Sequence, residues 1–559
     1  MNLRNGGQIL IDSLVTHGAS IAFGVPGESY LAALDAMHGR DDFRFIICRQ
    51  EGGAAMMADA VGKLTGRPGI CFVTRGPGAT NASPGIHIAQ HDSTPMILFI
   101  GQVARDQRDR GAFQEVDYKR HFADMAKWVA EIDDAARIPE YISRAFHTAT
   151  SGRPGPVVLA LPEDMLTDEV EAVDTPPFRA VEAAPPAEDI DRFTDMLAEA
   201  ERPFVLVGGG GWDGNVCAEL VRFAEAWNLP VSSGFRSQDR LDNNHPNYTG
   251  DVGIGPNPKL AQRVRDTDLL IALGSRMGEM TTSGYTLIEP PHPKQTLVHI
   301  FPDASEIGRV YHPALGIHSS MGPFLRAVNG RNARPGGWGE WTASARDDYE
   351  AWNGNLPTVP GDVSMAEVVG WLRDQLPRDT VICNGAGNFS MWMHRFYRYG
   401  HYRSQLAPTS GSMGYGTPAA VAAKILQPER TVIAIAGDGD FLMNGQELAT
   451  AMQYGAAIIV ILVNNGMYGT IRMHQEREFP GRPSGTELRN PDFAALARAY
   501  GAHGEVVEHT HEFPDAFARA QKSGKPALIE LKVDPEAITA VATLSQIREQ
   551  AIERKKAKG

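Results

Sequence analysis

Short, largely apolar runs recur along this chain, and glycine, proline or polar residues bound each of them. Amphipathic stretches with helical spacing lie between the runs. A continuous apolar run of this kind is typical of a strand buried on both faces of a parallel sheet. The alternation therefore predicts an α/β fold of mostly parallel sheets flanked by helices. The runs in the first third are FRFIIC (43–48), GICFVT (69–74), PMILFIG (95–101) and GPVVLALP (155–162).

The same alternation returns twice, and 559 residues are too many for one hydrophobic core. We expect three tandem doubly wound domains at residues 1–178, 188–332 and 358–545, followed by a solvated basic tail at 546–559. A segment rich in proline and acid, VEAVDTPPFRAVEAAPPAED, reads as the first linker. The later runs are RPFVLVGGGG (202–211), TDLLIALGS (267–275), TLVHIF (296–301), DTVICNGAG (379–387), TVIAIAGDGD (431–440), AAIIVILVNN (456–465) and KPALIELKV (525–533).

Charge and cysteine content narrow the classes of partner. A net charge of -14 disfavours nucleic acid and anionic membranes, so small molecules are the expected partners. No apolar run approaches the roughly 20 residues that span a bilayer. Four scattered cysteines without C-x-x-C spacing fit a reducing compartment, and we expect a cytoplasmic protein.

The stretch GDGDFLMNGQELATAMQYGAAIIVILVNNGMYG (437–469) places an acid and an amide after two successive apolar runs. Parallel strands joined by a helix end at the same edge of their sheet, so Asp438 and Asn465 should meet there. Asn444 and Glu447 fit a capping box at the start of the intervening helix, and Gly455 fits its end.

A carboxylate and an amide oxygen beside glycines and helix N-termini suit Mg²⁺ bound to a phosphorylated ligand. The alternative is a tight turn at Gly437 to Gly439 and an unrelated Asn-Asn-Gly turn. G-D-G, 24 residues and then N-N resembles the thiamine diphosphate (ThDP) binding motif. Over nearly its full length the chain is similar to the acetolactate synthase and pyruvate oxidase group of ThDP enzymes.

The resemblance implies a pyrimidine-binding (PYR), a middle and a diphosphate-binding (PP) domain, in that order. It also implies that Asp438, the side-chain oxygen of Asn465 and the carbonyl of Met467 bind Mg²⁺. The cofactor-binding positions that it implies are Pro26, Glu51, Asn81, Gly387, Asn388, Gly411, Met413, Gly437, Asp438, Gly439, Asp440, Asn465, Met467, Tyr468 and Gly469.

Three residues are catalytic candidates. Glu51 follows the run FRFIIC, and an acid in the first turn of a helix also interacts favourably with the helix dipole. By resemblance, Glu51 is the activating glutamate that hydrogen-bonds the cofactor's aminopyrimidine, and Gln114 in GAFQEVD hydrogen-bonds the substrate. Glu28 in GVPGES either adds an acid beside the reacting carbon or points outward. Met413 resembles the residue that supports the bent cofactor, or it fills a gap in the core.

Several positions depart from the acetolactate synthase pattern. Met280 stands where an arginine grips the second 2-keto acid, and a thioether cannot replace bidentate guanidinium recognition. His474 replaces a tryptophan that selects 2-ketobutyrate, and Glu28 replaces a glycine. Phe301 stands where FAD-binding members tend to have aspartate, which disfavours tightly bound FAD.

The expected function is ThDP- and Mg²⁺-dependent decarboxylation and carboligation of a 2-keto acid, as in acetolactate synthase. Alternatives are an aldehyde lyase, an aromatic 2-keto acid decarboxylase, a 2-hydroxyacyl-CoA lyase, or a noncatalytic ThDP-binding regulatory protein. In the family the counterpart of Glu51 and the diphosphate site come from different subunits. The resemblance therefore implies a homodimer or homotetramer with active sites between subunits.

Overall fold

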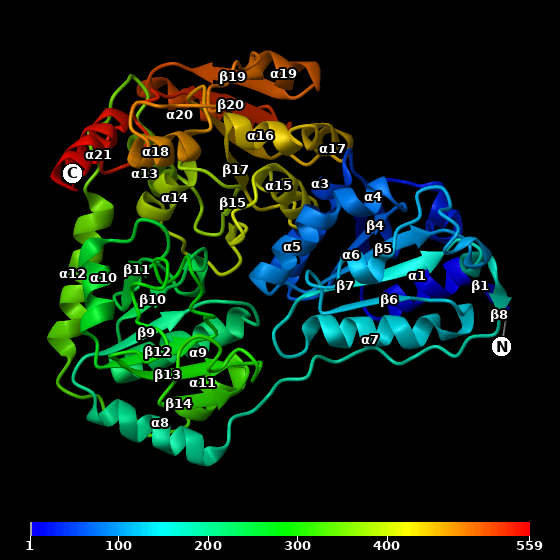
Figure 1. The fold of residues 1–559 in the computed structure, drawn as a ribbon, viewed down its shortest axis with the longest axis horizontal. Helices are drawn as coiled ribbons and strands as arrows, with labels where there is room; N and C mark the ends of the chain where they lie inside the picture. The colour runs from blue at the N-terminus through cyan, green and yellow to red at the C-terminus, as the bar shows by residue number, and fades with distance from the viewer. Residues whose placement is uncertain (1–2, 559) are drawn as a thin grey trace. The chain divides into compact units, whose positions relative to one another are not determined.

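The structure is a computed structural model that describes residues 3–558. It contains two compact units, whose elements are labelled in Figure 1. The first unit runs to Glu182 and includes Val421–Leu426, and the second contains Ala183–Ala420 and the chain from Gln427 onward. Within the described residues, the strands form three six-stranded sheets and one two-stranded pair. None of the described helices combines the length and the apolar character needed to cross a bilayer.

The first unit is built on the parallel sheet β3-β2-β4-β5-β7-β6. Its strands are β2 (Ile21–Gly24), β3 (Arg44–Ile47), β4 (Gly69–Val73), β5 (Met96–Gln102), β6 (Trp128–Glu131) and β7 (Pro156–Pro162), and β1 (Arg4–Asn5) pairs antiparallel with β8 (Glu169–Val170). Its helices are α1 (Gly6–Thr16), α2 (Leu31–Met37), α3 (Glu51–Thr65), α4 (Pro77–Asn81), α5 (Ser83–Asp92), α6 (Tyr118–His121) and α7 (Ile138–Thr150). The side chain of Gln50 accepts the Gly53 N–H, so helix α3 begins at Glu51.

The sheet that follows has the order β11-β10-β9-β12-β13-β14. Its strands are β9 (Pro203–Val207), β10 (Val231–Ser233), β11 (Tyr248–Asp251), β12 (Leu269–Leu273), β13 (Thr296–Phe301) and β14 (Leu315–His318). Its helices are α8 (Ala187–Glu199), α9 (Gly214–Trp227), α10 (Pro258–Asp266), α11 (Met321–Asn329) and α12 (Gly339–Gly354). Numbered along the chain, the order is 3-2-1-4-5-6, the arrangement of dinucleotide-binding folds.

The last sheet has the order β16-β15-β17-β18-β20-β19, and all its neighbouring strands are parallel. Its strands are β15 (Val381–Asn384), β16 (Gln405–Leu406), β17 (Val432–Gly437), β18 (Ile459–Asn464), β19 (His503–Val507) and β20 (Ala527–Lys532). The helices are α13 (Met365–Gln375), α14 (Phe389–Phe396), α15 (Gly416–Leu426), α16 (Asp438–Asn444), α17 (Glu447–Gln453), α18 (Gly469–Glu478), α19 (Phe493–Ala499), α20 (Phe513–Lys522) and α21 (Leu544–Lys558). The first and last sheets share one order, 2-1-3-4-6-5, when each is numbered along the chain.

The expected α/β fold with three mostly parallel sheets flanked by helices is confirmed, whereas the three domain boundaries stay predictions. The capping box at Asn444 and Glu447 is wrong, because α16 begins at Asp438 and Asn444 ends it. Two acids in the first turn of α16 favour that earlier start, and the Asn444 side chain donates to the Gly414 carbonyl instead. Gly455 does follow the end of α17, with a positive φ of 63°.

The C-terminal basic run is exposed over residues 552–557, and it belongs to a helix. Residues 544–558 form helix α21, which packs beside α18 (Figure 1). Its residues Ile547 and Ala551 are buried, and Arg548 pairs with the buried carboxylate of Glu476. Residue 559 lies outside the described residues.

Candidate functional site

The predicted site residues of the first unit follow the carboxyl ends of its parallel strands, on loops or at the ends of short or long helices. Pro26 and Glu28 follow β2, Glu51 follows β3, Asn81 follows β4 and Gln114 follows β5. This edge of a doubly wound sheet is where ligands bind.

Glu51 begins helix α3 and Asn81 ends helix α4, and their side chains are hydrogen-bonded. Asn81 Nδ2 donates to Glu51 Oε2 at 3.0 Å. A Cβ atom at Gly78 would lie 3.3 Å from Glu51 Oε1, so a small residue there leaves room for the carboxylate. The contact fixes the direction of the one acid expected to exchange a proton.

Arg75, which the sequence analysis did not single out, joins the other loops of this unit. Its guanidinium lies 3.3 Å from Glu28 Oε1 and donates to Glu163 Oε2 at 2.7 Å and to the Phe113 carbonyl at 3.2 Å. Arg75 is only 7% exposed, although it directly precedes a glycine-rich loop. Its position directly before G-P-G is visible in the sequence, but its burial and its partners are not.

The remaining candidates of this unit are exposed or half-buried. Glu28 has a side chain 66% exposed and pairs with Arg75, and Pro26 is exposed. Gln114 is half-buried with a φ of 63°, and its backbone lies against Gly76, where a Cβ would approach the Gln114 carbonyl to 2.9 Å. Ser29 Oγ and Thr74 Oγ1, 2.8 Å apart, join the β2 and β4 loops.

In the second unit, the loops after β17 and β18 meet as the spacing predicts. The Asp438 carboxylate accepts the Gly439 N–H at its Oδ1, at 2.9 Å. Its Oδ2 accepts the Gly466 N–H at 2.9 Å and Asn490 Nδ2 at 2.7 Å. Gly466 directly follows Asn465, so the predicted metal ligands of the two loops are neighbours.

The loop after β18 brings the other predicted ligands beside α16. Asn465 Oδ1 accepts the Met467 N–H at 3.3 Å. A Cβ at Gly439 would lie 2.5 Å from the Tyr468 ring, so glycine is required for this close approach. Asn465 Nδ2 would lie 3.1 Å from a Cβ at Gly469, the first residue of α18.

Residues Thr486–Asn490, here called the brace, run antiparallel beside this loop. The Tyr468 N–H donates to the Thr486 carbonyl at 2.9 Å, and the Leu488 N–H donates to the Gly466 carbonyl at 2.8 Å. Met467 and Glu487 pair across the two segments. The brace carries no family motif quoted above, and sequence reasoning missed it.

Asp440 joins the loops after β15 and β16 to α16. Its Oδ1 accepts the Ala386 N–H at 3.0 Å and the Gly414 N–H at 2.9 Å. A Cβ at Gly385 would lie 2.0 Å from the same oxygen. Burial raises the pKa of Asp440 to about 7. Within the described residues Asp440 Oδ2 is buried without a hydrogen-bond partner, as expected for a group that faces a polar ligand.

The other predicted diphosphate positions lie in the same unit. Asn388 is buried, its N–H donates to Thr470 Oγ1 at 2.9 Å, and its Nδ2 donates to the Ile538 carbonyl at 3.1 Å. Gly387 precedes it in the turn to α14, while Gly437 ends β17. Gly411 has a φ of 68°, and Met413 is half-buried in the same loop before α15.

The donor chemistry fits a hard cation and a phosphorylated ligand. Burial raises the pKa of Asp438, and the three N–H donors at its oxygens partly offset that effect. Among the described residues no three His, Cys, Asp or Glu side chains are grouped to hold a metal. A cation here would therefore take one carboxylate plus amide, carbonyl, phosphate and water oxygens, the ligand set that Mg²⁺ accepts.

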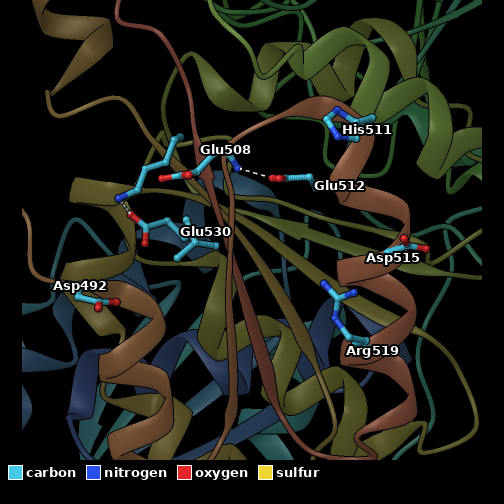
Figure 2. A pocket seen from close by; sticks show the side chains of 9 residues that line it. Asp492, Glu508, His511, Glu512, Asp515, Arg519 and Glu530 are labelled. Carbon is cyan, nitrogen blue, oxygen red and sulfur yellow. Dashed lines mark hydrogen bonds and ion pairs between the residues drawn. The ribbon is translucent and has the colours of Figure 1, made fainter.

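An open pocket of about 800 Å³ is lined by residues of the edge strand β19, its neighbour β20 and helix α20 (Figure 2). Carboxylates dominate its lining, and Glu530 on β20 is the one that also contacts Asn464 at the end of β18. The lining residues are Asp492, Val506, Glu508, His511, Glu512, Asp515, Arg519, Glu530 and Lys532.

Comparisons with known proteins identify the family of the chain. Models of the N-terminal TPP binding domain, the central domain and the C-terminal TPP binding domain of thiamine pyrophosphate enzymes match residues 4–121, 190–328 and 385–531. The acetolactate synthase large subunit of Parasynechococcus marenigrum is 32% identical over 546 residues, 95% of this chain and 87% of that protein. The chain belongs to the thiamine pyrophosphate enzyme family.

Two further relatives of this thiamine pyrophosphate (ThDP) enzyme carry similar names. A probable acetolactate synthase large subunit of Methanocaldococcus jannaschii is 32% identical over 558 residues, 95% of this chain and 92% of that protein. The acetolactate synthase isozyme 2 large subunit of Escherichia coli is 31% identical over 538 residues, 95% of this chain and 96% of that protein. The resemblance read from the sequence is confirmed, and the chain is a ThDP-dependent enzyme of the acetolactate synthase-like group.

Proposed function

We propose that this ThDP enzyme uses Mg²⁺ to join two molecules of pyruvate, releasing CO₂ and forming acetolactate. The observation that carries the proposal is the contact of the β17 and β18 loops at Asp438, where Gly466 N–H reaches Oδ2 at 2.9 Å. The names of the relatives support the choice of reaction. Two pyruvate anions and one proton balance one acetolactate anion and one CO₂.

The second unit holds the cofactor in this proposal. Asp438, the side-chain oxygen of Asn465 and the Met467 carbonyl would hold Mg²⁺, which would offset the negative charge of a bound diphosphate. Asp440 holds two flanking loops together, because the N–H groups of Ala386 and Gly414 donate to one oxygen of its carboxylate. ThDP, when bound, supplies the carbon nucleophile and the electron sink that decarboxylation of a 2-keto acid requires.

The first unit moves the proton. Glu51 would hold or release a proton at its carboxyl oxygen, next to the aminopyrimidine of a bound cofactor. Asn81 orients that carboxylate through its bond to Oε2, and Gln114 hydrogen-bonds an oxygen of the substrate. As in the family, we propose a homodimer or homotetramer in which each site combines Glu51 of one subunit with the metal site of another.

A second candidate, which Met280 favours, is action on aldehydes, aromatic 2-keto acids or 2-hydroxyacyl-CoA. Met280 is 38% exposed and cannot grip a second carboxylate as arginine does. The proposal includes no flavin, because Phe301 is 2% exposed at the end of β13, where FAD-binding members tend to have aspartate.

A substrate panel with ThDP and Mg²⁺ tests the choice of reaction. We expect acetolactate from pyruvate, measured after conversion to acetoin, and little turnover of benzoylformate or benzaldehyde. Turnover of the aromatic substrates without acetolactate would select the second candidate. If the chain binds ThDP but turns over none of these substrates, the result would favour a noncatalytic regulatory protein.

A further inference from the structure

One amide nitrogen joins the predicted metal ligand to the strand beside it. Asn490, the last residue of the brace, donates from Nδ2 to Asp438 Oδ2 at 2.7 Å and to Asn464 Oδ1 at 2.9 Å. A primary amide carries two N–H hydrogens, so both bonds form at once. A carboxylate only accepts, and this fixes the nitrogen of Asn490 toward Asp438.

The connection continues through the end of β18. Asn464 Oδ1 also accepts the Gly466 N–H at 3.1 Å, and its Nδ2 donates to Glu530 Oε1 at 2.6 Å. Glu530 is 1% exposed, and Lys532 donates to the same Oε1 from the lining of the open pocket (Figure 2). The carboxylates of Asp438 and Glu530 only accept hydrogen bonds, so they fix the direction of each hydrogen bond that joins them through Asn490 and Asn464.

We propose that Asn490 is a positioning residue that fixes Asp438 for Mg²⁺ binding and that Asn464 and Glu530 hold Asn490 in place. The inference rests on the proposed function, in which Asp438 is a metal ligand. Mg²⁺ requires near-octahedral geometry with bonds of about 2.1 Å, so a small rotation of the Asp438 side chain would weaken Mg²⁺ binding. Outer partners of this kind typically change metal affinity about 10- to 100-fold.

The brace supports the assignment independently of the side chain. Its backbone pairs with the loop of Asn465 and Met467, so one segment holds both the loop and the carboxylate. Asn490 is half-buried, and Pro491 and the helix cap Asp492 follow it directly. Proline restricts the backbone of the residue before it, which lowers the freedom of Asn490.

The test compares Asn490→Ala with Asn332→Ala, the same change at an exposed residue of the same unit. The dissociation constant of Mg²⁺ is measured by titration calorimetry on the full chain with saturating ThDP. We expect it to rise about 10- to 100-fold in Asn490→Ala and less than twofold in the control. With saturating Mg²⁺, kcat of Asn490→Ala should return to within about threefold of the wild type, because the metal site is weakened and not removed.

Asn490→Ser keeps a polar group too short to reach both partners and decides the question if the alanine variant does not fold. Wild-type affinity for Mg²⁺ in a folded variant would overturn the positioning role. A low kcat at saturating Mg²⁺ with an unchanged dissociation constant would overturn it as well. A wild-type chain that binds no Mg²⁺ with ThDP would instead refute the proposed function.

Discussion

Glu51 accepts one hydrogen bond from Asn81, and its proposed role is to exchange a proton with the cofactor. We expect Glu51→Gln to bind ThDP normally, because the amide still fills the site. Its turnover should fall at least about 100-fold, since an amide cannot exchange the proton. ThDP binding by fluorescence titration and a pyruvate assay measure the two effects. The exposed Glu169→Gln serves as control, and wild-type turnover in Glu51→Gln would remove the residue from the mechanism.

Arg75 contacts three loops of the first unit through one guanidinium. Arg75→Ala should lower the free energy of unfolding by about 1–3 kcal/mol, because charged hydrogen bonds are lost at a buried position. Arg120→Ala, whose side chain is 90% exposed, should change it by less than about 0.5 kcal/mol. Denaturant unfolding followed by circular dichroism measures both. Equal stability of the two variants would show that Arg75 does not join the loops.

Residues that follow apolar runs were predictable, while residues that join loops were not. Asp438 and Asn465 end two such runs, and parallel topology alone places their loops together. Arg75 and Asn490 act through contacts with segments far along the chain, and no local pattern encodes those partners. The roles given to single site residues are predictions that the variants test.

His299, on strand β13, shows how an element can carry a pH dependence. Burial lowers the pKa of His299 from 6.5 to about 4, while its Nε2–H donates to the Ser275 carbonyl at 3.0 Å. Between pH 4 and 6.5 the unfolded chain therefore binds more protons at this histidine than the folded chain. The stabilisation that neutral His299 gives to the folded state is complete above pH 6.5 and is lost as pH falls toward 4.

His299→Gln retains a donor for the Ser275 carbonyl but does not titrate. As pH falls from 6.5 to 4, the free energy of unfolding of the wild type should fall by up to about 3 kcal/mol more than that of His299→Gln. Denaturant unfolding across this range measures the difference, with the exposed His318→Gln of strand β14 as control. Parallel pH curves for wild type and His299→Gln would contradict a neutral buried histidine.

At the scale of elements, strands were easier to predict than helix ends. Continuous apolar runs indicate the strands, but the start of α16 depends on two acids in its first turn that interact favourably with the helix dipole. Helix α21 was not foreseen, because the charged residues of the tail outnumber the apolar ones. Ile547 and Leu544 nevertheless pack against Met473 and Ile538, and Arg548 reaches Glu476 on α18.

At the scale of the whole molecule, the proposed active site requires more than one copy of the chain. Sedimentation velocity should show particles of at least twice the 60.7 kDa chain mass at the concentrations used for assay. Mixing inactive Glu51→Gln with inactive Asp438→Ala should restore part of the activity, because hybrid dimers contain one site with both wild-type residues. Active monomers, or mixtures without any regained activity, would contradict sites shared between subunits.

The hydrogen bonds of Asp440 and the brace have a practical consequence for protein engineering. One carboxylate gathers two loops, and a separate segment supports a third, so the proposed metal pocket is spread over five stretches of polypeptide. Grafting the G-D-G and N-N signatures onto another scaffold would transfer the ligands without their supports. A transplant that is to bind the metal must carry Thr486–Asn490 with them.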